Sequence, residues 1–395
     1  MVSGACFIFI ALYLLAERLH VGRKTNRIPL RICVTGTRGK SSVTRLIAAS
    51  LREAGFNVLA KTTGSKPVLI FPDGKEEEIK RGNLPSILEQ KRLVRAGASL
   101  GVDALVSEMM SISCESGYVE SVQILRPHFL VLTNIRLDHA AQMGQTRQDI
   151  ARCLASSIPW KSTIFLLQKE MFPLFQARAE EMNSRIVQVS TDSSRDYFPS
   201  KKKLSFWEWP DNISLALGVA EFLGIDREVA WRGITRSRPD FGSLKIWQKD
   251  YDSPPRSCTL VSCFSANDPE STQLVLSSVL KNKIKEGKKM VGILNFRKDR
   301  GDRTCQWRNV LRRGAFPEFS RFYLTGSHAH AFKRRLDSAK KACFVVLEKK
   351  PPEKIMEQIL AEEKGDLVVV GMGNMGGVGK ELVSYWEQKG RRYDL

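Results

Sequence analysis

Residues 34–42, VTGTRGKSS, combine the residue types that hold a phosphate group. Gly36 and Gly39 allow the backbone to turn so that its N–H groups point inward at phosphate oxygens. Lys40 places a cation at the β- and γ-phosphates of a nucleotide, and either serine that follows it offers a hydroxyl to Mg²⁺. The predicted ATP-binding residues of this loop are Gly36, Thr37, Arg38, Gly39, Lys40, Ser41 and Ser42.

The phosphate loop is shorter than the usual G-x-x-x-x-G-K-[ST] pattern, because Gly36 stands only three residues before Gly39. Its context supports the prediction, since the apolar run over 30–36 predicts a strand and 40–54 predicts a helix. Kinases, GTPases, motors and ligases all use such a loop. The loop therefore predicts nucleotide binding without identifying the reaction.

Polar side chains follow two other apolar runs. Glu108 ends the run DALVSEM, where its carboxylate would bind Mg²⁺ directly or through water, or would cap the next helix. Asn134, Asp138 and His139 follow the run HFLVLTN. Because the carboxyl ends of parallel strands meet at one edge of a sheet, we expect these side chains in the same crevice as the loop. His139, beside Asp138, is a candidate for a second metal or for orienting a substrate carboxylate.

The elements that must position these residues alternate between strand and helix. Four apolar runs predict strands buried on both faces, at 30–36, 103–109, 128–134 and 163–168. Helices are predicted near 40–54, 85–98 and 145–156. This alternation indicates a parallel sheet with helices on both faces.

A second alternation begins after 237–257, a polar segment with the composition of a linker. Further strands are predicted at 259–264, 289–296, 321–326, 343–348 and 366–373. The fold class is therefore α/β, with a P-loop parallel-sheet domain followed by a smaller, Rossmann-like α/β domain. The predicted parts are a short membrane segment at 1–22, the P-loop domain at 23–240 and the second domain at 241–395.

Gly371, Gly373 and Gly376 follow the last predicted strand and spell G-x-G-x-x-G. A dinucleotide site also needs a second strand with an acidic residue about 20 positions further on. Only 19 residues follow Gly376. We therefore interpret this motif as the last strand–helix turn of the second domain, and NAD binding is not expected.

Residues 2–16 contain no charged side chain and are followed by Arg18, Arg23, Lys24 and further basic residues. This apolar run is shorter than the about 20 residues that span a bilayer. Because the positive charges follow the run, the positive-inside rule places the rest of the chain in the cytoplasm. We expect a single anchor in the cell membrane and cytoplasmic catalytic domains. The alternative is a buried N-terminal helix.

The chain has 395 residues and a formal net charge of +20, which favours anionic partners such as nucleotides, phospholipids or an acidic polymer. It contains no aromatic-interleaved basic repeat and no zinc-finger spacing, so nucleic acid is not an expected partner. Its eight cysteines include no CxxC pair. This usage indicates a reduced chain without a disulfide framework or a thiolate metal site.

Three motifs, VTGTRGKSS, VSEMMS and LTNIRLDH, resemble in order and spacing the central domain of the Mur ligases and folylpolyglutamate synthetases. The sequence is more similar still to the ligase subunits of poly-γ-glutamate synthetase, the PgsB/CapB type, which share the short apolar N-terminus. The segments that carry this second resemblance are AKTTGS (60–65), PDNISLALGVAEFLGID (210–226), SANDPEST (265–272) and RKDRGDRTCQW (297–307).

The resemblance implies an ATP- and Mg²⁺-dependent amide ligase that activates a glutamate carboxylate as an acyl phosphate and joins it to an amine. The product would be poly-γ-glutamate, and the partners would be small membrane subunits for synthesis and export. The resemblance assigns Lys40 to the γ-phosphate, Ser41 and Glu108 to a first Mg²⁺, and His139 to a second. Many Mur ligases add a carbamoylated lysine, and the nearby Lys161 stands in a context that does not match.

The remaining residues implied for the site are Asn212 near the adenine, and Asn267, Asp268, Arg300, Asp302 and Arg303 in a second domain that closes over the nucleotide. Catalytic roles fall to Lys40, His139, Arg300 and Arg303. Two other functions are open from the sequence: a membrane-anchored P-loop ATPase or kinase acting on a small anionic substrate, and a basic membrane scaffold. The second α/β domain favours the ligase, because a simple ATPase needs no closing arm.

Overall fold

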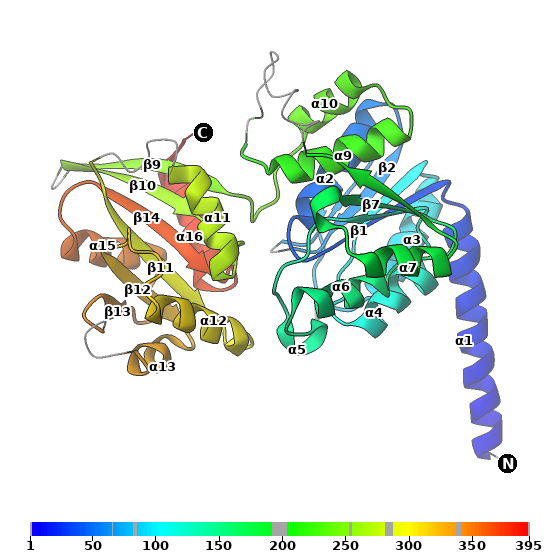
Figure 1. The fold of residues 1–395 in the computed structure, drawn as a ribbon, viewed down its shortest axis with the longest axis horizontal. Coiled ribbons are helices and arrows are strands. Elements are labelled where there is room, and N and C mark those ends of the chain that lie inside the picture. Colours follow the sequence, from blue (N-terminus) through cyan, green and yellow to red (C-terminus); the bar gives the residue numbers. More distant parts are fainter. Residues whose placement is uncertain are drawn as a thin grey trace. The chain divides into compact units, whose positions relative to one another are not determined.

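The computed structural model describes residues 2–64, 66–81, 85–191, 204, 206–252, 255–280, 287–336 and 341–393. The chain forms two compact units. Unit 1 comprises Met1–Leu204 and Trp209–Asp240, and unit 2 comprises Ser205–Glu208 and Phe241–Leu395. Each unit is built on one β-sheet flanked by helices (Figure 1).

The sheet of unit 1 has eight strands in the order β4-β3-β2-β5-β1-β6-β7-β8. Its parallel strands are β1 (Leu30–Thr35), β2 (Val58–Thr62), β5 (Ala104–Glu108), β6 (Phe129–Leu132), β7 (Thr163–Leu167) and β8 (Arg185–Val189). Every residue of β5, β6 and β7 is buried, as their β-branched and aliphatic composition predicts for strands covered on both faces.

The prediction of a purely parallel sheet is wrong at one edge. β3 (Val68–Ile70) and β4 (Glu76–Glu78) form a hairpin that pairs antiparallel with β2. Both strands are only three residues long, and the EEE sequence of β4 carries no apolar run. A short edge hairpin of this kind leaves no periodic signal in the sequence, although its turn at Gly74 has a φ of 80°.

Helices cover both faces of this sheet (Figure 1). One face carries α2 (Lys40–Glu53), α9 (Pro210–Phe222) and α10 (Arg227–Arg236). The opposite face carries α3 (Glu89–Leu100), α4 (Cys114–Tyr118), α6 (Arg147–Ala155) and α7 (Pro173–Glu181), with α5 (Ala140–Met143) and η2 (Gln168–Glu170) in the connections. α4 continues directly into a π-helix, η1 (Val119–Leu125).

α1 (Val2–Asn26) is one continuous helix whose last turns belong to the core of unit 1. Val21 and Thr25 are buried, and Glu17 forms an ion pair with Lys91 at 2.8 Å. Large apolar side chains earlier in the helix are exposed: Phe7, Ile8, Phe9, Ile10, Leu12, Tyr13, Leu14, Leu15 and Leu19. Among the described residues, no helix has both the length and the apolar character required to cross a membrane.

The sheet of unit 2 has seven strands in the order β13-β12-β11-β14-β10-β9-β15. Its parallel strands are β10 (Pro255–Ser262), β11 (Lys289–Phe296), β12 (Arg321–Gly326), β13 (Phe344–Val346) and β14 (Leu367–Gly373). The helices are α11 (Pro269–Leu280), α12 (Gly301–Arg312), α13 (Ala329–Arg334), α15 (Pro352–Glu362) and α16 (Val378–Lys389). This α/β alternation confirms the fold class predicted for the second half of the chain.

The interpretation of 237–257 as a linker is wrong over much of its length. β9 (Lys245–Asp252) pairs antiparallel with β10, and the two-residue β15 (Arg391–Arg392) pairs with the outer edge of β9. Trp247 is buried and lies 6.0 Å from the Trp386 ring. Charged side chains that made this segment resemble a linker lie in the second half of β9, which is partly exposed and therefore tolerates polar residues.

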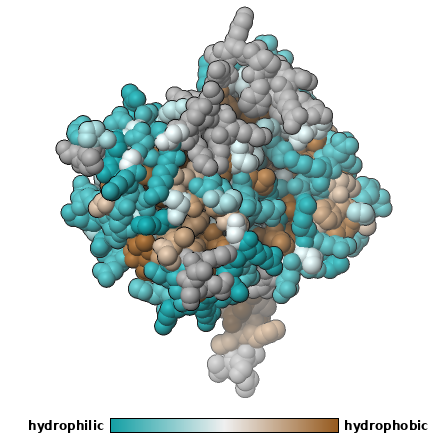
Figure 2. All heavy atoms as spheres, turned by 60° about the vertical axis from the view of Figure 1, so that its left-hand side comes forward, coloured by the Kyte–Doolittle hydropathy of each residue, from teal (hydrophilic) through white to brown (hydrophobic). Residues whose placement is uncertain are grey.

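The surface of the protein agrees with its high content of charged residues. On the face drawn in Figure 2, hydrophilic side chains predominate and apolar ones form small separate areas. The core of unit 2 is built on aromatic and aliphatic side chains that include Trp247, Phe264, Tyr323 and Trp386.

Candidate active site

The phosphate loop connects the carboxyl end of β1 to the first residue of α2. Gly39 caps the helix in the left-handed conformation, with φ of 80°, and Gly36 has φ of 121°. A Cβ atom on Gly36 would lie 2.2 Å from Thr133 Oγ1, and one on Gly39 would lie 2.6 Å from Asn212 Oδ1. Both positions therefore require glycine for conformation and for space.

The Asn134 side chain forms hydrogen bonds with the phosphate loop. Its Oδ1 accepts hydrogen bonds from Thr37 Oγ1 at 2.8 Å and from the Arg38 amide at 3.1 Å. Its Nδ2 donates to the Arg38 carbonyl at 3.0 Å, and Thr133 Oγ1 donates to the same carbonyl at 2.6 Å. The sequence predicted that Asn134 would reach this crevice, and the structure gives it contacts with the loop backbone that set the loop conformation.

Ser41 and Glu108 lie together beside the loop. β1 and β5 are parallel with Val34 opposite Glu108, so the carboxylate ends its strand next to the first turn of α2. Ser41 Oγ donates to Glu108 Oε2 at 2.8 Å, and the Thr63 amide donates to the same oxygen at 2.6 Å. A hydroxyl and a carboxylate are oxygen ligands that suit Mg²⁺, which takes its other ligands from phosphates and water. This pair therefore fits a magnesium ion.

Lys40 lies over its own loop. Its Nζ donates to the Gly36 carbonyl at 2.8 Å and to the Thr37 carbonyl at 3.4 Å. Burial lowers the pKa of Lys40, and the nearby carboxylates of Glu108 and Asp138 partly offset that shift. The ammonium is therefore held where a phosphate oxygen would stabilise its charge.

Asp138 and His139 lie on the same side of the loop as Arg38. Arg38 Nη1 is 3.2 Å from Asp138 Oδ2, and His139 Nε2 is 3.7 Å from the same oxygen. His139 has φ of 50°, which is rare for a non-glycine residue and indicates a constrained backbone. The structure thus brings Asp138 and His139 to the loop, as the strand order predicted.

The structure gives less support to a second metal site at His139 than to the first site at Ser41 and Glu108. Within the described part of the chain, no group of three or more His, Cys, Asp and Glu side chains could hold a metal ion. Lys161 is exposed and precedes β7, at the amino end of the parallel strands and therefore at the edge opposite the phosphate loop. Lys161 is thus excluded as the lysine that would complete such a site.

Two other predicted nucleotide ligands lie on the helices that flank the loop. Ser42 is in the first turn of α2, and Asn212 is in the first turn of α9. Asn212 is buried and is the side chain that a Cβ atom on Gly39 would meet. The structure therefore places Asn212 against the loop itself.

A buried polar network behind Glu108 was not predicted from the sequence. Glu120, on the π-helix η1, is fully buried and accepts hydrogen bonds from Gln90 Nε2 at 2.6 Å and from the Met110 and Ser111 amides at 3.0 and 2.8 Å. Gln90 Nε2 also donates to the Glu108 carbonyl at 3.2 Å. Glu120 and Gln90 therefore fix the backbone at and directly after the candidate metal ligand.

Lys61 extends this network. Its side chain is 1% exposed, its Nζ lies 3.1 Å from Glu89 Oε2, and it donates to Gln90 Oε1 at 3.4 Å. Burial lowers the pKa of Lys61 and raises the pKa of Glu120. The only sequence signals were a charged residue inside a strand, β2, and the AKTTGS motif that contains it. Neither signal identifies the partners.

Unit 2 collects its predicted residues at the carboxyl ends of its parallel strands. After β10, Asn267 has φ of 62° and its carbonyl accepts a hydrogen bond from Trp307 Nε1 at 2.9 Å. Asp268 Oδ1 accepts from the Ser271 amide at 2.8 Å, at the start of α11. Asp268 therefore acts as a helix cap in addition to any contact with a ligand.

The charged loop after β11 is ordered, and its arginines differ in burial. Arg300 caps α12 and Asp302 lies in the first turn of that helix. Arg303 is buried, and its Nη1 donates to Asn374 Oδ1 at 3.1 Å. The structure thus brings these residues to one edge of the unit 2 sheet, while the phosphate-loop residues occupy the corresponding edge of the unit 1 sheet.

The glycine motif at the end of β14 is a packing feature. A Cβ atom on Gly371 would lie 2.2 Å from the Phe264 ring, and Asn374 follows β14 to hold Arg303. α16 begins at Val378, and in the described part of the chain β15 is the one strand that follows it in the sheet. This arrangement agrees with a terminal strand–helix turn.

Comparisons with known proteins match both halves of the chain. Residues 34–217 match the Mur ligase middle domain, and residues 249–389 match the poly-gamma-glutamate synthase CapB C-terminal domain. The chain is 32% identical over 383 residues to PGA synthase CapB of Bacillus subtilis, which covers 96% of this chain and 95% of that protein. It is 34% identical over 313 residues to the capsule biosynthesis protein CapB of Bacillus anthracis, covering 78% of this chain and 66% of that protein.

Solved structures share the fold. E. coli FolC in complex with DHPP and ADP has a TM-score of 0.63 at 14% identity, covering 94% of this chain and 92% of that chain. MurF from Acinetobacter baumannii has a TM-score of 0.63 at 15% identity, covering 93% of this chain and 80% of that chain. These similarities confirm the predicted Mur ligase and folylpolyglutamate synthetase fold, and the identity to the two CapB proteins confirms the predicted family. The chain belongs to the CapB family of poly-γ-glutamate synthases.

Proposed function

We propose that this protein is an ATP-dependent amide ligase that activates a glutamate carboxylate and joins it to an amine to build poly-γ-glutamate. The observation that carries the proposal is the Ser41–Glu108 pair, 2.8 Å apart, beside Lys40 on a glycine loop at the start of a helix. The family assignment supports the substrate, because the matched Bacillus subtilis relative is named a PGA synthase.

The proposed chemistry activates a carboxylate that is a poor acylating agent at neutral pH, because its leaving group would be an oxide. A carboxylate oxygen attacks the γ-phosphorus of ATP, ADP leaves, and the resulting acyl phosphate then has phosphate as its leaving group. The amine nitrogen attacks the acyl carbon, loses a proton and expels inorganic phosphate. Each cycle therefore converts ATP, an acid and an amine into ADP, phosphate and an amide.

The residues of unit 1 have separate tasks in this scheme. Lys40 stabilises the charge that develops on the phosphoryl oxygens, and the loop amides held by Asn134 do the same from the backbone. Bound Mg²⁺ would supply further charge stabilisation at the phosphates, with Ser41 and Glu108 as its protein ligands. His139, beside Asp138, is proposed to position the carboxylate, and Asn212 to bind near the adenine.

Unit 2 is proposed to supply the closing arm, with Arg300 and Arg303 in catalytic roles and Asn267, Asp268 and Asp302 as nucleotide contacts. Closure would exclude water from the acyl phosphate. The functional parts we propose are 23–240 for nucleotide binding and 241–395 for this arm.

We also propose that α1 holds the protein at the cell membrane, with both units in the cytoplasm and small membrane subunits as partners in synthesis and export. Support comes from the row of exposed apolar side chains between Phe7 and Leu19 and from Arg23 and Lys24 in the last turn of the helix. Basic residues that follow an apolar segment favour the cytoplasmic side.

The route through an acyl phosphate is testable by isotope transfer. Membranes that contain the protein are supplied with ATP, Mg²⁺ and glutamate labelled with ¹⁸O in the γ-carboxylate. We expect label in the released inorganic phosphate, because one carboxylate oxygen leaves with it, and we expect hydroxylamine to trap a hydroxamate. AMP and pyrophosphate as products would indicate an adenylate, and a stable phosphorylated product without an amide would indicate a kinase. Either result would refute the proposal.

A further inference from the structure

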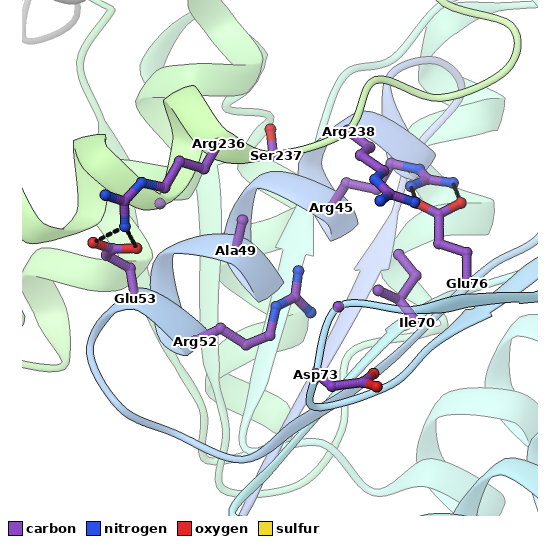
Figure 3. Close-up of a pocket in the computed structure, with 12 residues that line it drawn as sticks. Arg45, Ala49, Arg52, Glu53, Ile70, Asp73, Glu76, Arg236, Ser237 and Arg238 are labelled. Atoms are coloured by element: carbon purple, nitrogen blue, oxygen red, sulfur yellow. Dashed lines mark hydrogen bonds and ion pairs between the residues drawn. The ribbon is translucent and has the colours of Figure 1, made fainter.

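A pocket of about 310 Å³ lies on unit 1, apart from the phosphate-loop residues. Three segments form its walls: α2, the β3–β4 hairpin, and the end of α10 with the residues that follow it (Figure 3). Its volume is at the lower end of the about 300–1,000 Å³ found for small-molecule sites. Its basic side chains are Arg45, Arg52, Arg236 and Arg238.

Two of these arginines are committed to carboxylates of the pocket wall. Arg45 is buried and forms a two-pronged pair with Glu76 at 2.6 and 3.2 Å. Arg236 donates to both carboxylate oxygens of Glu53 at 2.8 Å. Figure 3 shows these two pairs on opposite sides of the pocket. They fix the walls and leave little charge for a ligand.

The other two arginines have no carboxylate partner within the described segments. Arg52 extends from α2 into the middle of the pocket (Figure 3), and its Nη1 is buried without a hydrogen-bond partner among the described atoms. Arg238 lines the same pocket and is exposed. Burial lowers the pKa of Arg52, and the nearby carboxylates of Glu76 and Asp73 offset that shift only in part. A buried guanidinium nitrogen without an acceptor is costly, and an anionic ligand would satisfy it.

We infer that this pocket binds the free α-carboxylates of an acidic polymer, the proposed γ-linked product, through Arg52 and Arg238. The inference rests on the proposed function for the identity of the polymer. A singly charged carboxylate matches the pocket better than a doubly charged phosphate does, because Glu53, Asp73 and Glu76 also line it and would repel the larger charge. A guanidinium fork binds a carboxylate through two parallel hydrogen bonds.

The position of Arg52 along α2 determines how long a ligand must be to reach both the phosphate loop and this pocket. Lys40 is the first residue of α2, and Arg52 stands in its last turn. At 1.5 Å per residue the two are separated by about 18 Å along the helix. A single glutamate is too short to connect them, whereas a chain of several γ-linked residues is long enough. The pocket would therefore retain the growing chain between additions and would bind longer chains more tightly than short ones.

Binding of fluorescein-labelled γ-linked glutamate oligomers of two and of ten residues to the detergent-solubilised full-length protein tests this inference. We expect the decamer to bind at least tenfold more tightly than the dimer, and Arg52→Gln combined with Arg238→Gln to weaken decamer binding at least tenfold. Arg52→Lys, which keeps the charge and loses the fork, should give an intermediate value. The matched control Arg152→Gln removes an arginine that is 71% exposed on α6 and should stay within twofold of the wild type.

Competition distinguishes the possible ligands. Labelled decamer is displaced either with inorganic phosphate or with unlabelled decamer, at equal concentrations of phosphate ions and of carboxylate groups. If phosphate displaces the labelled decamer equally well, the pocket is a phosphate site and the inference is wrong. Decamer affinity that is unchanged in the double variant would also refute it. Circular dichroism melting of each variant checks that a loss of binding does not reflect unfolding.

Product length separates this inference from the proposed function. In the double variant we expect the initial rate of ADP release to stay within twofold of the wild type, and the mean product length to fall at least threefold. Wild-type protein that makes no amide would refute the proposed function. Wild-type protein that makes amide, together with a double variant that makes chains of normal length, would refute only the pocket.

Discussion

Chemistry at the scale of single residues is concentrated in Lys40, Ser41 and Glu108. The hydroxyl and the carboxylate are already in contact at 2.8 Å, so these protein ligands are pre-arranged. Lys40 is held by two carbonyls of its own loop. Such pre-organised charge costs little reorganisation when the phosphoryl group is transferred, which is why it contributes more to the rate than to stability.

We expect Lys40→Met to reduce turnover by about 10²-fold or more, because an opposite charge at the phosphoryl oxygens is lost. Stability should behave differently. Burial lowers the pKa of Lys40, because the fold accommodates the neutral amine better than the ammonium. The contribution of neutral Lys40 to folding stability is fully present above the ordinary lysine pKa. It is lost as pH falls through the lowered pKa. At neutral pH the ammonium therefore costs stability.

The melting temperature of Lys40→Met at pH 7 should accordingly equal or exceed that of the wild type. The advantage should shrink as pH rises toward the ordinary lysine pKa. Calorimetric melting at pH 7 and pH 9.5, with ADP release measured in parallel, checks both parts. Wild-type turnover in a folded Lys40→Met protein would contradict the assignment of the phosphate loop.

Glu108→Gln keeps the size of the side chain and its hydrogen bond from the Thr63 amide but removes the negative charge. We expect the Mg²⁺ concentration for half-maximal activity to rise about tenfold, because a neutral amide oxygen is a weaker ligand for a hard cation. A magnesium titration of ADP release measures this change. Glu181→Gln, at a position 66% exposed on α7, is the charge-matched control and should follow the wild-type curve. Overlapping curves for all three proteins would remove Glu108 from the metal site.

At the scale of elements, the π-helix η1 explains how Glu108 is held. A π-helix places one extra residue in a turn and often marks a functional position. Here the π-helix places Glu120 in the interior of unit 1. The Glu120 carboxylate accepts hydrogen bonds from Gln90 of α3 and from two backbone amides that follow β5, so it connects these two segments. Within the described residues the hydrogen bonds of Glu120 go to Gln90, Met110 and Ser111 and not to the phosphate loop. It is therefore a positioning residue that acts through the backbone of Glu108.

Glu120→Gln should lower the free energy of unfolding by about 1–3 kcal/mol, because an amide NH₂ cannot accept from the three donors that surround it. It should also raise the Mg²⁺ requirement, a change that loss of packing alone would not produce. Glu115→Gln, at an exposed position of the preceding helix α4, is the control. Urea unfolding and a magnesium titration test the two parts, and an unchanged magnesium requirement would limit Glu120 to a structural role.

The stability difference between the wild type and Glu120→Gln should change with pH in a defined direction. Burial raises the pKa of Glu120, so the contribution of this group to stability is fully present below the ordinary glutamate pKa and is lost as pH rises through the raised value. The stability advantage of the wild type over Glu120→Gln should therefore be largest in acid and shrink as pH rises. Urea unfolding of both proteins between pH 4 and pH 8 measures the difference.

At the scale of the whole molecule, the chain combines two α/β units with a long N-terminal helix. Each unit places polar side chains at the carboxyl ends of its own parallel strands, as expected for α/β sheets. The last turns of α1 are part of unit 1, because Val21 and Thr25 are buried there. The earlier turns expose their apolar side chains and are not needed to complete that core.

Deletion of residues 1–20 should therefore leave unit 1 folded and release the chain from membranes. The ion pair of Glu17 with Lys91 would be lost, and a partly exposed pair contributes about 1 kcal/mol or less. Membrane fractionation and thermal melting of the truncated protein check the two outcomes. A reporter fused after Leu395 should be cytoplasmic. Retention of the truncated chain in membranes from cells without partner subunits would contradict anchoring by α1.

Features that depend on neighbouring residues could be predicted from the sequence. Gly36, Gly39, Lys40 and Ser41 form the phosphate loop because the turn and the helix start are local. The buried parallel strands were predictable because continuous apolar runs identify them, and the order of strand and helix then brought Glu108 and His139 to the right edge. The motifs were also enough to predict the family.

Features that depend on contacts between distant segments could not be predicted from the sequence and are seen in the fold. Asn134 fastens Thr37 from 97 residues away, and Glu120 meets Gln90 from 30 residues away. Sequence patterns report periodic burial but do not report which buried polar group satisfies which other group. The sequence of β9 resembles a linker because the second half of this strand is partly exposed and carries charged residues. The pocket around Arg52 could not be predicted because its walls come from three separate segments, whose packing buries Arg52 Nη1 without a hydrogen-bond partner among the described atoms.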